Sequence, residues 1–181
     1  AWAPVFLMRR FGVSILDAGM MLGSVAALAG VGGMLFNGWW VDRRFAAGRV
    51  DSHLRHYVAV CGIGAMAAVL AFSGAQGVAQ FLVPYTLVYF LQPFTGPAAA
   101  MIQIVTPPQL RGRVAALFLL VMNLMGLCLG PALIGLLTDF VLHDPGRVGD
   151  ALSLAFILLS PPGIALFLAG AREMRKSGIG A

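Results

Sequence analysis

Two tyrosines and a glutamine, Tyr85, Tyr89 and Gln92, are the side chains best suited by type and spacing to bind a small molecule. At 100° per helical residue they fall within one stripe of a helix. Hydroxyl and amide groups donate and accept hydrogen bonds. Gln92 lies about 13 residues into an apolar run, near the middle of a bilayer at 1.5 Å rise per residue, where an unpaired amide is unfavourable. We therefore expect this stripe to line a substrate path.

Structural roles for the same residues are also consistent with the sequence. Tyr85 and Tyr89 could be aromatic residues of the membrane interface, and Gln92 could hydrogen-bond to another helix. Asn123 is a second amide in the middle of an apolar run. We include it in the substrate path, although an asparagine at that depth more often joins helices than binds a ligand.

A second group of residues, Gly38, Asp42 and Arg43, has the spacing G-x-x-x-D-R at the end of an apolar run. A glycine permits close approach of another helix. An acidic side chain there can face the positive end of a neighbouring helix dipole, and basic residues mark the inner face of a membrane. This pattern indicates a contact at a cytoplasmic helix end.

The sequence contains few residues in patterns that would indicate enzyme catalysis. His53 and His56 fall in a polar connection over 42–56, where a histidine is usually solvated, and no metalloprotease, serine-elbow or paired-carboxylate pattern occurs in the sequence. Cys61 and Cys128 lie inside apolar runs and are expected to be packing residues. We expect no enzyme activity, no metal site and no cofactor.

Composition determines the elements that must position these residues. The mean hydropathy is +0.90, and 60% of the residues are hydrophobic while only 10% are charged. This composition predicts an all-α integral membrane protein with one helical domain over 1–181. The expected elements are the end of a truncated helix over 1–10 and full spans over about 15–41, 57–72, 79–105, 114–142 and 151–171.

Two of these spans have a distinctive composition. Residues 57–72 contain no strong polar residue beyond Tyr57, so we expect a supporting helix that faces lipid. Residues 79–105 contain Pro84, Pro93 and Pro97. Because proline lacks a backbone donor, we expect this helix to be bent or partly opened, as at transporter binding sites.

The positive charges predict the orientation. If the chain crosses at each span, most of the lysines and arginines fall on one side, and only Arg9, Arg10 and Arg147 fall on the other. Loops rich in these residues stay in the cytoplasm, so the C-terminus is expected there. The net charge of +5 then suits anionic membrane lipids as partners, and no nucleic acid is expected.

Together, the helix order, the charge bias and the G-x-x-x-D-R loop resemble the C-terminal six-helix half of a major facilitator superfamily transporter. The stretches TPPQLRGRVAAL and NLMGLCLGPALIGLLTD resemble bacterial Spinster-like members. The resemblance implies a secondary active transporter of the bacterial inner membrane, a symporter or antiporter that moves a small organic or amphiphilic solute by alternating access. It also implies that Gly38, Asp42 and Arg43 form a cytoplasmic gating motif against an N-terminal six-helix half.

The sequence also leaves room for a non-transporting membrane subunit or scaffold. Glycines recur along 19–33, and such a face serves static helix packing as well as a moving contact. No carboxylate lies deep in any expected span, so a proton-coupling acid is expected only in the other half.

Overall fold

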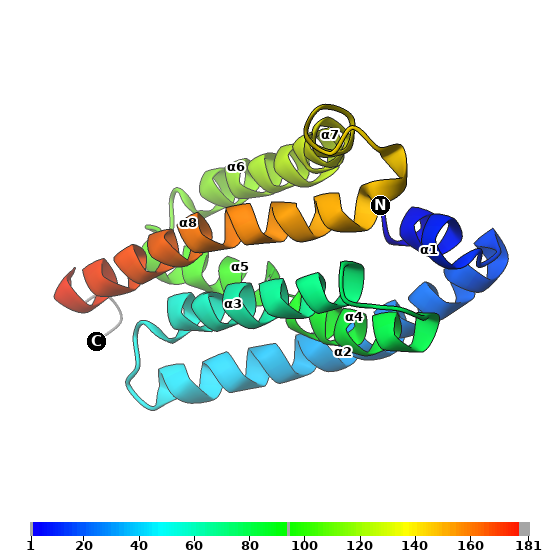
Figure 1. Cartoon of the computed structure of the whole chain (residues 1–181). Coiled ribbons are helices and arrows are strands. Elements are labelled where there is room, and N and C mark those ends of the chain that lie inside the picture. Colours follow the sequence, from blue (N-terminus) through cyan, green and yellow to red (C-terminus); the bar gives the residue numbers. More distant parts are fainter. Residues whose placement is uncertain (1, 94, 178–181) are drawn as a thin grey trace.

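The computed structural model describes residues 2–93 and 95–177, which form helices joined by short connections, with no strand among them (Figure 1). The elements are α1 (Ala3–Phe11), α2 (Ile15–Ala46), α3 (Ser52–Phe72), α4 (Val78–Leu91), α5 (Thr95–Val105), α6 (Arg111–Asn123), the π-helical η1 (Leu124–Leu129), α7 (Gly130–Leu136), the π-helical η2 (Leu137–Val141), the 3₁₀ turn η3 (Pro145–Arg147) and α8 (Val148–Ser177). Four helical stretches are long and apolar enough to cross a membrane: Ile15–Ala46, Ser52–Phe72, Arg111–Val141 and Val148–Lys176. The chain is thus an all-α membrane protein.

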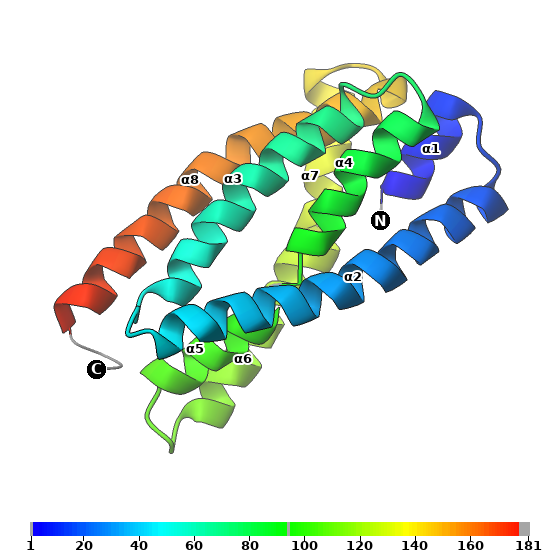
Figure 2. The ribbon, with the colours of Figure 1, turned by 90° about the horizontal axis from the view of Figure 1, so that it is seen from below.

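Helix α3 lies at the centre of the bundle, beside α4 on one side and α8 on the other (Figure 2). Near its C-terminal end, Phe72 packs with Phe6 of α1 and Phe81 of α4, at ring-centroid distances of 5.3 and 5.5 Å. The prediction of a lipid-facing supporting helix therefore fits only one face of α3, where Ile63, Met66 and Leu70 are at least half exposed, and it is wrong for the opposite, packed face. Its small residues, such as Ala68 and Ala71, are fully buried because they let neighbouring helices come close.

The third predicted span, 79–105, is divided into α4 and α5. Helix α4 ends at Leu91 and α5 begins at Thr95, so the chain is not one continuous helix there. Pro93 lies between the two helices and has no N–H to donate to the preceding turn. The opening that the prolines predicted is thus present, and it lies next to Gln92.

Residues 111–141 form a continuous helical stretch with two π-helical segments. The first, η1, ends just before Pro131, which cannot donate to the carbonyl four residues earlier. The Gly130 N–H instead bonds to the Met125 carbonyl, five residues back. A proline in the helix thus accounts for the wider turn before it.

The polar connection predicted over 42–56 is much shorter in the structure, because α2 continues to Ala46 and α3 begins at Ser52. His53 is therefore in the first turn of α3, 2% exposed, with its ring 5.4 Å from the Phe45 ring. The expectation of a solvated histidine is wrong at this position. The C-terminal ends of α2 and α8 and the first turns of α3 and α6 lie at one end of the bundle, which gathers most of the arginines there (Figure 2).

Candidate functional site

A cavity of about 490 Å³ lies between α3, α4, α8 and the 111–141 stretch. This volume is within the range of pockets that hold drug-sized ligands. Its wall is mostly aliphatic and aromatic, and the polar side chains on it are Tyr57, Cys61, Gln92 and Ser160. The described residues that line it include no charged side chain, so it is suited to an uncharged ligand with an apolar body.

Gln92 is the member of the predicted substrate path that the structure places on this cavity. It is the residue that follows the last turn of α4, and its backbone N–H still donates to the Val88 carbonyl at 2.9 Å. Its side chain is exposed although most of its neighbours are apolar. An amide in this position can donate and accept hydrogen bonds with a bound molecule.

The other three predicted path residues lie elsewhere. The centroid of the Tyr85 ring is 4.8 Å from that of Phe81 and 5.2 Å from that of Tyr89. Tyr85 is 7% exposed and lies in this aromatic core. Asn123 is exposed, and its Nδ2 atom donates to the Leu119 carbonyl at 2.8 Å, one turn earlier in the same helix. The structure therefore brings Tyr85 and Tyr89 together but separates them and Asn123 from the cavity wall.

A buried amide that the sequence analysis overlooked lies on α2. Asn37 is 0% exposed, and its Nδ2 atom donates to the Phe90 carbonyl of α4 at 2.9 Å. One turn earlier on α2, Gly33 lies against the same carbonyl, and a Cβ atom on Gly33 would overlap it. A lone asparagine in an apolar run was the available signal, but the sequence does not identify its partner.

The predicted gating residues are near the C-terminal end of α2, where the structure leaves them open. Apart from the nearby backbone of α2 itself, no atom of the described residues lies within 4 Å of the position that a Cβ on Gly38 would take, so Gly38 makes no close contact with another described helix. Asp42 and Arg43 are exposed. The Arg43 guanidinium lies 5.7 Å from the Trp39 ring centroid, within cation–π range.

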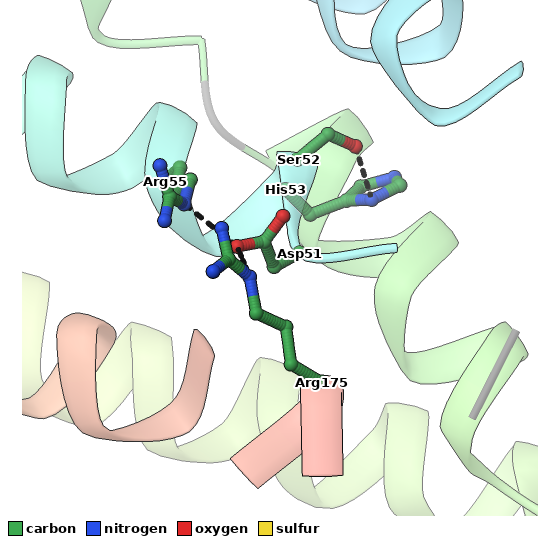
Figure 3. A network of polar contacts seen from close by, with 5 residues as sticks. All are labelled: Asp51, Ser52, His53, Arg55 and Arg175. Carbon is green, nitrogen blue, oxygen red and sulfur yellow. Dashed lines mark hydrogen bonds and ion pairs between the residues drawn. The ribbon is translucent and has the colours of Figure 1, made fainter. Parts of the chain in front are cut away.

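A second polar site that the sequence analysis did not find joins the start of α3 to the end of α8 (Figure 3). The Asp51 side chain is 4% exposed, and its Oδ2 atom accepts from Arg55 Nε at 2.6 Å and from Arg175 Nε at 2.7 Å. Burial alone would raise the pKa of Asp51, but the hydrogen bonds and charges of the two arginines outweigh it and hold the pKa below its usual value. Asp51 is thus an ionised link between two helices that are distant in sequence.

The described residues include no group of three or more histidine, cysteine, aspartate or glutamate side chains that could hold a metal ion. The site therefore offers hydrogen bonding and apolar contact. Its position beside an opened helix is typical of binding sites in transport proteins.

Comparison with known proteins agrees with this description. The chain is 30% identical over 178 residues to an MFS-type efflux pump of Mycolicibacterium smegmatis (strain ATCC 700084 / mc(2)155). The match covers 96% of this chain and 41% of that protein, so the chain spans less than half the length of its relative. No protein-family model matches the sequence, and no solved structure matches it significantly. The chain is therefore similar, over nearly all of its length, to part of an MFS-type efflux pump.

Proposed function

We propose that this chain is the C-terminal half of a major facilitator superfamily transporter that exports a small, uncharged, amphiphilic or lipophilic molecule. The observation that carries the proposal is the uncharged cavity of about 490 Å³ with Gln92 on its wall, beside the opening between α4 and α5. The similarity to an MFS-type efflux pump supports the same class of function. A Spinster-like transporter of the bacterial inner membrane, with its C-terminus in the cytoplasm, agrees with the sequence patterns.

The cavity wall indicates the chemical class of the substrate. Transferring an ion into an apolar site without a partner charge is very costly, and the described lining residues provide none. Gln92 and Ser160 instead offer hydrogen-bonding groups on the wall, while Phe118, Phe156 and Phe167 provide apolar contact surface. A molecule with one neutral polar end and an apolar body satisfies both parts of the wall.

Alternating access requires a second half, and two features of α2 provide a surface for it. Leu28, Val31 and Leu35 are 61 to 78% exposed along the helix. Gly38 faces open space near the exposed Asp42. We propose that the N-terminal six-helix half covers part of this surface and that Gly38, Asp42 and Arg43 contact it at the cytoplasmic gate. Coupling to a second ion, in symport or antiport, would then depend on residues of that half.

Cys61 lies on the cavity wall and provides a direct test. The test uses the full-length transporter, with both halves, carrying the substitution Cys128→Ser. The rate at which N-ethylmaleimide labels Cys61 is measured with and without a neutral lipophilic dye. Efflux of the same dye is measured in cells. We expect the dye to slow labelling and to be exported. The absence of both effects for a panel of neutral and charged dyes would contradict the proposal.

Gln92→Ala is the matched site variant. Loss of one buried hydrogen bond should weaken dye affinity by about 2- to 30-fold, equivalent to about 0.5 to 2 kcal/mol. Thr86→Val is a control on the same helix, because the Thr86 hydroxyl donates to the Leu82 carbonyl of its own helix. A lower melting temperature with unchanged dye affinity for Gln92→Ala would remove Gln92 from the site.

The alternative function is that of a non-transporting membrane subunit or scaffold. The cavity could then hold a ligand without moving it. Protection of Cys61 without any efflux would favour this alternative over the transporter.

A further inference from the structure

We infer that Asn37 is a positioning residue for the cavity, because its amide holds the open end of α4 and thereby directs Gln92 toward the ligand. This inference rests on the proposed role of Gln92 in binding. Asn37 does not line the cavity itself. It acts through the Phe90 carbonyl, two residues before Gln92.

The end of α4 creates the need for an outside donor. The last four carbonyls of a helix have no N–H partner within that helix. Helix α4 ends at Leu91, and its last described regular hydrogen bond runs from the Gln92 N–H to the Val88 carbonyl. Pro93 has no N–H to donate to the Tyr89 carbonyl, and the Phe90 carbonyl follows it at the open end of the helix. In the apolar interior of a membrane protein an unsatisfied carbonyl is costly. The Asn37 amide supplies a donor to the Phe90 carbonyl from a different helix.

Two contacts with the same carbonyl fix the position of this turn. The Asn37 Nδ2 atom donates to the Phe90 oxygen at 2.9 Å, while the backbone of Gly33, one turn earlier on α2, lies directly against that oxygen. Gln92 is still joined to this turn, since its N–H donates to the Val88 carbonyl. The position of Phe90 relative to α2 therefore determines where the Gln92 side chain begins.

The orientation of the Asn37 amide is determined by its donor role. Its Oδ1 atom is buried without a hydrogen-bond partner among the described residues, while Nδ2 is bonded. Turning the amide over would place its oxygen against the Phe90 oxygen and would leave two acceptors facing each other. A fully buried amide with an unsatisfied oxygen is unfavourable for stability. The need of α4 for a donor explains why this amide is found at the helix opening.

The first experiment does not depend on a ligand. The full-length transporter, with both halves, carries Cys61→Ser and Cys128→Ser. A cysteine is introduced as the reporter by Gln92→Cys, and the rate at which N-ethylmaleimide labels it is measured. Asn37→Leu keeps a similar volume but removes the donor, so the end of α4 should loosen and labelling should rise at least threefold. Ser24→Ala is the control on α2, because the Ser24 hydroxyl donates within its own helix, to the Met21 carbonyl. An unchanged labelling rate for Asn37→Leu would overturn the inference.

The second experiment separates positioning from general stabilisation. Dye affinity is measured for Asn37→Leu, Gln92→Ala and the double variant. If Asn37 acts through Gln92, each single variant weakens affinity by about 2- to 30-fold and the double variant is no weaker than Gln92→Ala alone. If Asn37 only stabilises the fold, the melting temperature falls while affinity stays unchanged, which would also overturn the inference.

The two experiments distinguish the inference from the proposed function. A protein that binds no dye but still shows faster labelling with Asn37→Leu would retain the link between Asn37 and α4 and would contradict the proposed transport role. A protein that binds and exports dye with no response to Asn37→Leu would retain the transport role and contradict the positioning role.

Discussion

Helix α3 and the helical stretch 111–141 are both long and apolar, yet they are buried to very different extents. The 111–141 stretch has the higher mean hydropathy, 2.2 against 1.6 for α3. Nevertheless α6 and η1 contain no buried residue, and the rest of the stretch has only Ile134, Leu137 and Thr138 buried. In α3, buried residues occur from Ser52 to Phe72. Hydropathy therefore does not indicate which membrane helix has protein neighbours.

Side-chain size explains this difference better than hydropathy does. Ala67, Ala68 and Ala71 of α3 are small enough to let α4 and α8 approach. Leu117, Leu120 and Leu127 in the other stretch are 60 to 73% exposed. Leucine side chains are as compatible with lipid tails as with protein, so they create no drive toward protein contact. The same exposed side chains are available to the proposed second half.

The two regions also satisfy their polar groups differently. At the start of α3, Asp51 binds Arg55 and, across the bundle, Arg175 of α8. In the 111–141 stretch, Asn123 and Thr138 donate to carbonyls of their own helix. A helix that meets lipid must satisfy its polar groups internally, whereas a packed helix end can use a neighbour.

The largest expected effect compares a phenylalanine of α4 that packs against α3 with a phenylalanine of the 111–141 stretch. Phe81, in the core beside α3, is 0% exposed, and Phe140 of η2 is 71% exposed. We expect Phe81→Ala to lower the free energy of unfolding by about 3 kcal/mol because it leaves a cavity. Phe140→Ala should lower it by less than about 0.5 kcal/mol. Unfolding of the purified protein in mixed detergent micelles measures both, and equal losses would contradict the comparison.

A smaller effect is expected from the Asp51 link. Asp51→Asn removes both ion pairs, and we expect a loss of about 1 kcal/mol, since Arg55 and Arg175 are each more than half exposed and screened by solvent. Glu173→Gln is the control, because the Lys176–Glu173 pair lies within α8 and both of its side chains are 71% exposed. Its loss should be near zero in the same unfolding assay. If Asp51→Asn is as mild as the control, the Asp51 ion pairs contribute no measurable stability to the contact between α3 and α8.

The pH dependence of the Asp51 link follows from the direction of its pKa shift. The folded-state pKa lies below the ordinary value of 3.8, so the link stabilises the protein fully above that value and is lost as the pH falls through the folded-state pKa. The difference in melting temperature between the protein and Asp51→Asn should therefore be constant from pH 7 to about pH 5 and should shrink below about pH 3.8. A difference that shrinks as the pH rises would have the wrong sign for this mechanism.

The smallest effect is expected at Asn123. Its side chain is exposed and bonds within its own helix, so Asn123→Ala should change the melting temperature by less than the scatter of replicate measurements, equivalent to less than about 0.5 kcal/mol. A large loss of stability would show instead that Asn123 joins two helices, as its sequence context suggested. Such a result would require a contact outside the described residues, with the proposed second half as the first candidate.

Much of the fold could be predicted from the order of apolar runs and charges. The helical character and the opening near Pro93 follow from local chemistry, because lipid requires internal hydrogen bonding and proline removes a donor. Helix ends were less predictable. The predicted connection over 42–56 was too long at both ends. Polar residues such as Asp42 and His53 belong to α2 and α3, because a helix continues through a polar residue when the turns next to it are helical.

The candidate site could be predicted only in part. Gln92 was predicted from its depth in an apolar run, and it lies on the cavity wall, while its role in binding stays a prediction. Tyr85 and Tyr89 share its stripe on α4 but lie in the aromatic core, because helical periodicity relates residues along one helix and does not specify what that face meets. Asn37 and Asp51 were missed for the same reason.

The sequence by itself determined that this protein is an all-α membrane protein with its basic residues gathered at one end, because those properties depend on composition and on the order of local segments. Only the tertiary structure decided that Asn37 meets Phe90 and that Asp51 meets Arg175. These pairs lie 53 and 124 residues apart in the chain. Their contact depends on which helix faces pack together, and in an apolar bundle that choice is made by the close fit of small residues and by a few polar groups that need partners.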